Sequence, residues 1–421
     1  MKKLNVAVIG SGLSAIGSLA AIRRYLPNSN VTIYTHTEVS NLKTRHKLLF
    51  HSGSPSFKYG LHLAKSITNS NIDSDSNDPI VKAISYYCFG GSSKVWGGAC
   101  HPLLDYETQY FDPYINKGYE EVAKLFGCDS QFVDYMSKPV SINSGANYTK
   151  TLTLGTRLKL NTYKVSSVTN DLIVKFGRVV NCDVKKITNI GKQILLEYDE
   201  VNGSRTYAKY DYVVIAGGVV GTTTLLSSYY DNLLSLTYST NDQYFFVSKY
   251  NMTFNRSTFG PPSILVNSIS EHPIYIQLYP INLSSIVNSE NLFLTSKDAL
   301  SSGFMAAYLY IDCRSSAKVQ IQSFRGGPCK SYIVDPLKKI CLDTKKLKNT
   351  LKGLGIDIIG NPLKLFPTSS QHIGGGFQNS FNSSNSNIAV VDTSVMKHLP
   401  LCTIGFTSAA NAYNVTRNFF I

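Results

Sequence analysis

The first 35 residues contain a glycine-rich turn between a short apolar run and a longer amphipathic pattern. Val6 to Ile9 is apolar and partly β-branched, which is typical of a strand buried on both faces of a parallel sheet. Gly10-Ser11-Gly12 follows directly, and apolar residues then recur at helical spacing from Leu13 to Ile22. A second β-branched run, Val31 to Tyr34, comes next. The pattern predicts one βαβ unit with its glycines at the strand-to-helix turn.

The small residues of this turn have the spacing of a dinucleotide-binding motif, Gly10-x-Gly12-x-x-Ala15. The first glycine permits a tight turn, the second lets a pyrophosphate approach the backbone, and the small third residue lets the helix pack closely on the strand. The helix N-terminus adds free N–H groups and the positive end of its dipole. We therefore expect the phosphates of a dinucleotide to lie against Gly10, Ser11, Gly12, Ser14 and Ala15.

The end of the second predicted strand departs from this motif. An acidic residue commonly stands there and binds the adenosine ribose, whereas this chain has Thr35, with Glu38 three residues later. Two interpretations remain open: the Thr35 hydroxyl or Glu38 binds the ribose, or that contact is absent.

A second glycine cluster, residues 90 to 98, surrounds the only tryptophan of the chain. Glycine loses the most backbone entropy on folding, so this segment would make a poor core element. It is better suited to a loop that lies against a flat ligand and donates N–H and hydroxyl groups to it. The residues expected in this contact are Gly90, Gly91, Ser92, Ser93, Trp96 and Gly97.

Two further segments repeat the pattern of a buried strand beside glycines. Tyr212 to Ile215 is followed by Ala216-Gly217-Gly218, and the last 55 residues contain His372-Ile373-Gly374-Gly375-Gly376 and then Val390-Val391-Asp392-Thr393-Ser394. Together and in this order, the four glycine-containing segments resemble the glucose–methanol–choline (GMC) oxidoreductases, flavoproteins that oxidise alcohols with FAD. The resemblance covers about half of the chain, at both ends of the nucleotide-binding part.

The resemblance implies where FAD contacts this chain. Gly10, Gly12 and Ala15 would lie at the pyrophosphate, and Val184 would hold the adenine through its backbone. Some relatives attach the flavin covalently through a His or Cys of the second cluster, but Lys94 stands nearest that place here. We therefore expect non-covalent FAD. The remaining contacts implied by the resemblance are Ala216, Gly217, Asp392 and Ser394.

The resemblance also implies a catalytic pair. Family members have a His in a pattern matched by His372 to Gly376, and a second His or Asn about eleven residues after the aspartate that Asp392 matches. That count reaches Thr403. A neutral imidazole suits removal of a hydroxyl proton near neutral pH, whereas a threonine hydroxyl can orient the substrate oxygen but cannot act as a base. We expect His372 to be the base and Thr403 to orient the substrate; His398 is an alternative partner, although a role beside the helix is favoured for it.

The expected fold class is α/β, with a Rossmann-type FAD-binding domain and an inserted sheet-rich (α+β) substrate domain. The FAD-binding domain would span residues 1–231, as segments of about 1–100 and 150–231 with a linking segment at 101–149. The substrate-binding domain would span 232–365. Residues 366–421 would return to the FAD domain and carry the catalytic site.

Composition sets limits on location and partners. The eight cysteines form no C-x-x-C pair and have no histidine at zinc-finger spacing, so we expect reduced thiols, no metal site and a cytoplasmic protein. The start of the chain is not typical of an export signal, and no run is long and apolar enough for a membrane span. The formal charge of +14 comes from dispersed Lys and Arg, which favours an anionic substrate or a peripheral membrane contact over a nucleic-acid partner.

The expected reaction is oxidation of a hydroxyl group of a sugar, polyol or other alcohol to a carbonyl, by hydride transfer to flavin N5. The electron acceptor is unknown. Two alternatives remain open: a flavin-dependent non-redox isomerase or mutase acting on a sugar, which Thr403 would favour, and a catalytically inactive FAD-binding protein.

Overall fold

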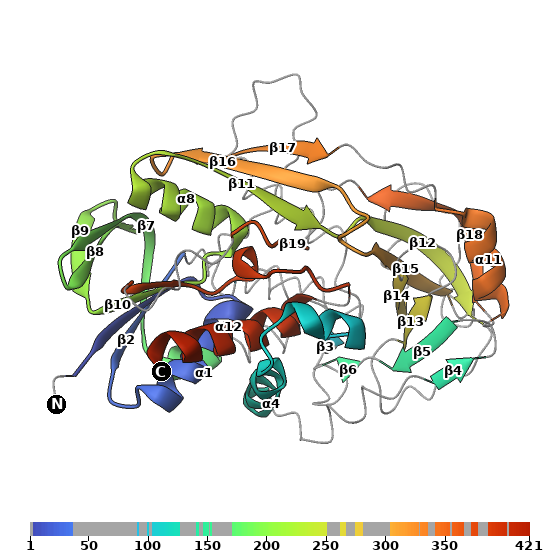
Figure 1. The fold of residues 1–421 in the computed structure, drawn as a ribbon, viewed down its shortest axis with the longest axis horizontal. Coiled ribbons are helices and arrows are strands. Elements are labelled where there is room, and N and C mark those ends of the chain that lie inside the picture. Colours follow the sequence, from blue (N-terminus) through green and yellow to red (C-terminus); the bar gives the residue numbers. More distant parts are fainter. Residues whose placement is uncertain are drawn as a thin grey trace.

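The structure is a computed structural model, and Figure 1 shows its fold. It describes residues 3–36, 91, 99–100, 103–126, 140–142, 146–150, 152–153, 171–250, 262–266, 274–280, 304–327, 329–335, 342–353, 356–365, 372–377, 386–401 and 404–421. Two seven-stranded sheets lie toward opposite ends of the long axis of the molecule, and a four-stranded sheet lies between them (Figure 1).

The first sheet is built from three separate parts of the chain. Its strand order is β20-β10-β1-β2-β7-β8-β9. The five strands from β20 to β7 pair in parallel, and β7, β8 and β9 form an antiparallel meander. The strands are β1 (Asn5–Ile9), β2 (Asn30–Thr35), β7 (Arg178–Ile190), β8 (Gln193–Glu200), β9 (Arg205–Tyr210), β10 (Tyr212–Ile215) and β20 (Ile388–Val390).

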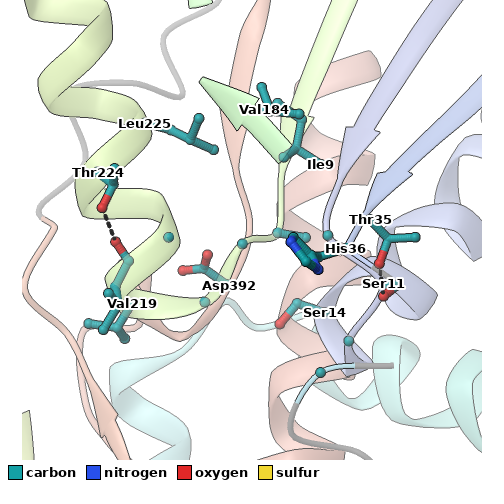
Figure 2. A pocket seen from close by; sticks show the side chains of 18 of the residues that line it. Ile9, Ser11, Ser14, Thr35, His36, Val184, Val219, Thr224, Leu225 and Asp392 are labelled. Carbon is teal, nitrogen blue, oxygen red and sulfur yellow. Dashed lines mark hydrogen bonds between the residues drawn. The ribbon is translucent and has the colours of Figure 1, made fainter. Parts of the chain in front are cut away.

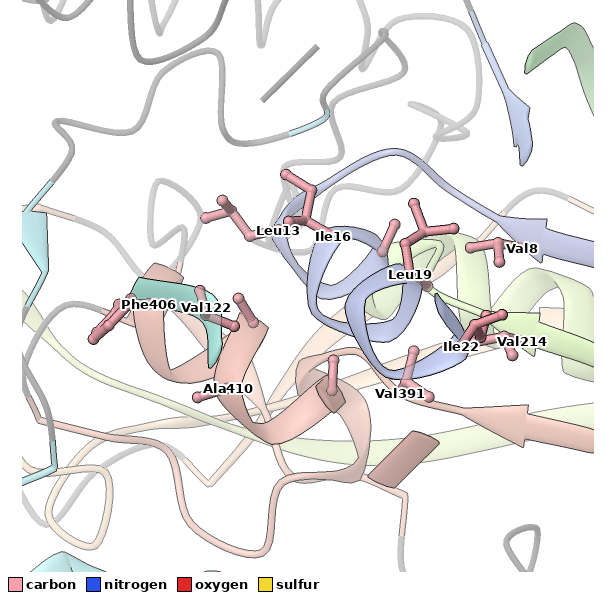
Figure 3. Close-up of a cluster of buried hydrophobic side chains, with 14 of the residues drawn as sticks. Val8, Leu13, Ile16, Leu19, Ile22, Val122, Val214, Val391, Phe406 and Ala410 are labelled. Atoms are coloured by element: carbon pink, nitrogen blue, oxygen red, sulfur yellow. The ribbon is translucent and has the colours of Figure 1, made fainter. Parts of the chain in front are cut away.

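Helices cover both faces of this sheet, which explains why Val6 to Ile9 of β1 are all apolar. Val6 and Val8 pack against α1 (Leu13–Tyr25), α4 (Ile115–Leu125) and α12 (Ile404–Phe420), whereas Ala7 and Ile9 belong to the core on the side of α8 (Gly218–Tyr230). Figure 3 shows side chains of α1 meeting those of β1, β10 and α12 in the first of these cores. This sheet and the helices on its two faces therefore form the three-layer arrangement expected of a parallel sheet.

The second seven-stranded sheet is antiparallel in all its pairings, with the order β18-β12-β15-β14-β13-β5-β4. Helix α11 (Thr344–Gly353) packs Leu347 and Leu351 into the core of this sheet. The strands are β4 (Val140–Ile142), β5 (Ala146–Lys150), β12 (Gln243–Tyr250), β13 (Pro262–Val266), β14 (Ile274–Pro280), β15 (Phe304–Ile311) and β18 (Ile356–Leu365).

The four-stranded sheet follows the order β17-β16-β11-β19 and brings a C-terminal strand beside strands from the middle of the chain. Its strands are β11 (Leu233–Thr240), β16 (Lys318–Phe324), β17 (Lys330–Asp335) and β19 (Ile373–Gly374). The shorter elements are the strand pair β3 (Ala99–Cys100) and β6 (Leu152–Thr153) and the 3₁₀ helices η2 (Asp105–Tyr110) and η4 (Thr393–Val395).

The structure departs from what the sequence suggests in two places. The apolar run Leu172 to Val174 is typical of a strand, but residues 171–176 are helical. Its pattern fits a helix because Ile173 is fully buried and Val174 is 62% exposed, while Leu172 and Phe176, one turn apart, pack against the same core. In addition, β4 and β5 come from the segment expected to link parts of the first domain, yet β5 pairs with β13 in the second sheet.

No helix in the part of the chain that the structure describes is long and apolar enough to span a membrane.

Candidate functional site

A cavity of about 460 Å³ lies at the carboxyl ends of the parallel strands of the first sheet (Figure 2). The residues that follow β1, β2, β10 and β20 all contribute to its wall, because parallel strands end at the same edge of a sheet. The helices that begin nearby close it from the sides. This edge is the usual place for a ligand in a fold of this class.

The turn after β1 brings backbone rather than side chains to the cavity. Gly10 has φ +112°, a conformation that side chains rarely adopt, and a Cβ at this position would overlap the carbonyl oxygen of Ala216. Its N–H donates to the Tyr34 carbonyl oxygen at 2.8 Å. The hydroxyls of Ser11 and Thr35 are hydrogen-bonded at 2.6 Å, as Figure 2 shows. Glycine is therefore required at position 10, where the ends of β1, β2 and β10 come together.

Three helix N-termini line the cavity. Gly12 and Gly217 are the N-caps of α1 and α8, and neither helix has a side-chain capping bond. Helix α12 contributes Ile404 and Ser408, and the Ser408 hydroxyl bonds to Ser14 of α1 at 2.5 Å. The first turns of all three helices are described and contain no acidic residue. The uncapped N–H groups of α1 and α8 and the dipoles of all three helices make this edge suitable for an anion, above all a phosphate.

Asp392 is a buried carboxylate in the cavity wall, where it caps η4. Burial raises the pKa of Asp392, and hydrogen bonds from Ser394, Thr222 and the backbone N–H of Gly218 oppose that effect. The Ser394 N–H and hydroxyl donate to it at 2.9 and 2.5 Å. Ser394 is fully buried and does not line the cavity, so its contact with the site runs through Asp392.

One side of the cavity is formed by β7. Val184 lines it, as Figure 2 shows, and the pairing of β7 with β8 shifts register between Val184 and Lys186. A bulge of this kind leaves one residue without a ladder partner and bends the strand. Lys185 is that residue, and it also lines the cavity, half-exposed and paired with Asp183 at 2.5 Å. The bulge therefore presents backbone groups and one cation at this side.

His372 is buried just before β19, and its imidazole lies parallel to the ring of Tyr310 with centroids 4.9 Å apart. Burial lowers the pKa of His372 to about 4, so the ring is neutral at pH 7. The next residue, Ile373, lines the cavity, whereas His372 is not among the lining residues. The histidine therefore does not form part of the cavity wall, although the residue that follows it does.

The structure brings most of the described candidates together. The expected residues that line the cavity are Gly10, Ser11, Gly12, Ser14, Thr35, Gly91, Val184, Ala216, Gly217 and Asp392. Ala15 is fully buried in the core between α1 and the sheet, where a small residue allows close packing. Six candidates, and Glu38, lie outside the described residues: Gly90, Ser92, Ser93, Trp96, Gly97 and Thr403.

His398, the alternative catalytic partner, lies elsewhere. It is 5% exposed, stacks on Tyr110 and stands between Cys313 and Glu107. Burial lowers the pKa of His398, but the contacts with Cys313 and Glu107 outweigh burial and raise it to about 9. His398 does not line the cavity.

Sequence reasoning missed several lining residues. Gly326 and Gly327, in the turn between β16 and β17, reach the cavity together with Cys329. A Gly-Gly pair predicts a turn, but nothing local indicates that this turn folds against the first sheet. Ser408 stands in a run of small residues that gives no local sign of a site, and its contact with Ser14 depends on the packing of the two chain ends.

Three solved structures of oxidases match nearly the whole chain. They are pyridoxine 4-oxidase from Mesorbium loti (TM-score 0.54, 13% identity, 99% of each chain), formate oxidase from Aspergillus oryzae RIB40 (TM-score 0.58, 10% identity, 100% of this chain and 98% of the other), and a fungal aryl-alcohol oxidase (TM-score 0.53, 10% identity, 100% and 99%). The formate oxidase structure concerns modification of its FAD. No protein-family model and no curated protein matches the chain. The chain therefore has the α/β fold of these oxidases, and the fold expected from its resemblance to the GMC oxidoreductases is confirmed.

Proposed function

We propose that this protein is an FAD-dependent oxidoreductase of GMC type that oxidises a hydroxyl group of an alcohol, sugar or polyol to a carbonyl. The observation that carries the proposal is the convergence of glycine turns and uncapped helix N-termini on one cavity. The similarity in fold to oxidases, one of which is described with FAD, supports it further.

The residues of the cavity fit FAD. The pyrophosphate would be held by the Gly12 and Ser14 end of α1, where a side chain at Gly10 would overlap Ala216. Thr35 ends β2 beside Ser11 and would contact the ribose, and the backbone of Val184 at the β7 bulge would contact the adenine. FAD would be non-covalent. When bound, it supplies the acceptor for the hydride that leaves the substrate carbon.

His372 is the proposed base of this reaction. Its ring is neutral at pH 7 because burial lowers its pKa to about 4, and a neutral imidazole is the form that can accept the hydroxyl proton. Tyr310 fixes the plane of the ring by stacking. Thr403 would orient the substrate oxygen through its hydroxyl.

Two observations favour an alternative function. His372 is not among the residues that line the cavity, and burial makes its imidazolium costly. Both facts suit a protein that binds FAD without oxidising an alcohol, and a flavin-dependent isomerase would also leave the flavin oxidised.

Anaerobic titration of the flavin-bound protein separates these functions. A panel of alcohols, polyols and sugars, anionic members included, is added without oxygen while flavin absorbance is followed. Bleaching by one substrate supports the proposed reaction. Product formed with unchanged flavin supports the isomerase, and neither change supports the binding protein.

The variant His372→Ala tests the assigned base. It is expected to bind FAD, but the substrate should bleach its flavin about 10²–10⁴-fold more slowly, which is the usual contribution of a positioned base. His372→Ala that bleaches as fast as the parent contradicts the assignment. The proposal also includes a location in the cytoplasm and the steering of an anionic substrate by the basic surface. It does not assign the electron acceptor.

A further inference from the structure

A buried cluster of metal-ligating side chains lies where the end of β15 meets the segment before α12. Asp312 and Cys313 directly follow β15, and His398 precedes α12 by six residues. They are 0%, 5% and 5% exposed, and one ligand atom from each lies within 4.8 Å of the other two. None of the three lines the cavity. This cluster is therefore separate from the proposed FAD site.

The spacing of its sulfur and nitrogen atoms matches a shared metal ion. Cys313 Sγ and His398 Nδ1 are 3.4 Å apart. A tetrahedral zinc ion with usual bond lengths to sulfur and nitrogen holds these two atoms about 3.5 Å apart. Since the Asp312 oxygen lies within 4.8 Å of both, a shift of roughly 1 Å would complete three ligands.

The outer contacts of the cluster are also those of a metal site. The Nε2 atom of His398 lies 3.4 Å from Oε1 of Glu107, a fully buried carboxylate. Glu107 is fixed in turn by the Leu401 N–H at 2.6 Å. Metal-binding histidines commonly direct their second ring nitrogen at a carboxylate, which sets the tautomer and the ring orientation. Glu107 occupies that place here.

Asp312 is held in the same way. Its oxygens accept from Arg314 Nε and from the Tyr106 hydroxyl, each at 2.8 Å. Ligating carboxylates are usually fixed by such bonds. With an ion present, its two charges and that of Arg314 would balance the thiolate, Asp312 and Glu107. A buried site with no net charge avoids a large desolvation penalty.

We propose that Asp312, Cys313 and His398 bind a zinc-class divalent ion, with Glu107 orienting His398. Sulfur and imidazole ligands favour zinc over calcium or magnesium. Among the described residues no fourth ligand joins the cluster, so the fourth position would take water or another donor. The sequence indicated no metal site because the ligands are 85 residues apart and lack motif spacing.

Such an ion would join β15 to the segment that leads into α12. Tyr310, which stacks on His372, stands two residues before Asp312. The ion would therefore fix the strand end beside the proposed base. The metal proposal does not depend on FAD or on activity.

The first test measures zinc content. The full-length protein as purified is loaded with zinc at mildly alkaline pH, because protons leave the ligands more readily there. It is then passed over a chelating resin, and its zinc content is measured by elemental mass spectrometry. About one ion per chain is expected. Cys313→Ser and His398→Gln are expected to lose it, and Glu107→Gln to bind zinc about 10–100-fold more weakly. Cys329→Ser, which removes another buried thiol, should retain the ion.

A second measurement uses the unchanged protein, so it does not depend on whether a variant folds. X-ray absorption should show one sulfur at about 2.3 Å and nitrogen or oxygen at about 2.0–2.2 Å. No retained zinc, retention by folded Cys313→Ser, or an absorption spectrum without a sulfur ligand would overturn the proposal and leave only a thiol–imidazole hydrogen bond.

Discussion

Gly10, which follows β1, stands directly against the backbone carbonyl of Ala216, which follows β10. The two residues belong to different glycine segments, 206 residues apart, and the contact holds the two turns together at one edge of the sheet. Any side chain at position 10 would have to displace the backbone of the second turn.

The first prediction concerns this contact. Gly10→Ala should destabilise the protein by well over about 1 kcal/mol, because it combines a positive φ with an overlap against backbone. It should also lose FAD. Gly191→Ala is the matched control: Gly191 has φ +79°, but a Cβ there meets nothing within 4 Å. For this control, urea unfolding should show a free energy of unfolding lowered by about 1 kcal/mol. Its FAD content should equal that of the parent. Equal effects of the two variants would disprove the role of the contact.

The packing of α1 against α12 gives a second prediction. A Cβ at Gly17 would overlap the carbonyl oxygen of Ala409, so Gly17→Ala must push α12 away from α1. A cost of about 1–3 kcal/mol is expected, as for other overpacked sites. Gly353→Ala, at the end of α11, has open space and should leave the urea midpoint unchanged or raise it. A Gly17→Ala midpoint equal to that of the parent would contradict this packing.

Asp392 gives a third prediction, based on its buried hydrogen bonds. Asp392→Ala leaves the buried Ser394 and Thr222 hydroxyls without their acceptor, so it should lower the free energy of unfolding by about 2–4 kcal/mol. Asp392→Asn keeps one oxygen and should cost less than half as much. Equal losses in chemical denaturation would show that the charge of Asp392, and not its hydrogen bonds, stabilises the fold.

A fourth prediction follows from the low pKa of His372. Because burial lowers it from 6.5 to about 4, the unfolded chain binds this proton at a higher pH than the folded protein. The histidine therefore makes stability fall as pH drops from 6.5 to about 4, by about 3 kcal/mol in total.

The measurement is urea unfolding at a series of pH values. His372→Gln should remove this part of the slope, whereas Tyr310→Phe, which keeps the stacked ring, should retain it. An unchanged slope in His372→Gln would show that His372 is not held neutral by burial.

The sequence predicts the cavity best where the lining residues are close together in the chain. The β1 turn, α1 and β2 follow one another directly, so their spacing alone indicates a phosphate-binding edge. Asp392 is indicated by the resemblance to the GMC family, because it belongs to a matched motif that directly continues a buried strand. Both inferences depend on residues that are neighbours in the chain.

What the sequence leaves open depends on contacts between distant residues. Nothing near Gly326 indicates the cavity, and nothing near Cys313 indicates His398 and Glu107, because these residues meet only after the sheets are assembled. The same holds for β5, which lies between β13 and β4 in the second sheet, although its sequence does not indicate which large sheet it joins. Tertiary packing decides such cases.

FAD binding by the cavity is tested most directly by the visible absorbance of the purified protein, with the released cofactor identified by mass spectrometry after denaturation. The predicted result is a flavin spectrum with about one FAD per chain, as expected for a single dinucleotide-binding edge, released without a covalent bond. A colourless protein that binds no added FAD would contradict the proposed function at its foundation.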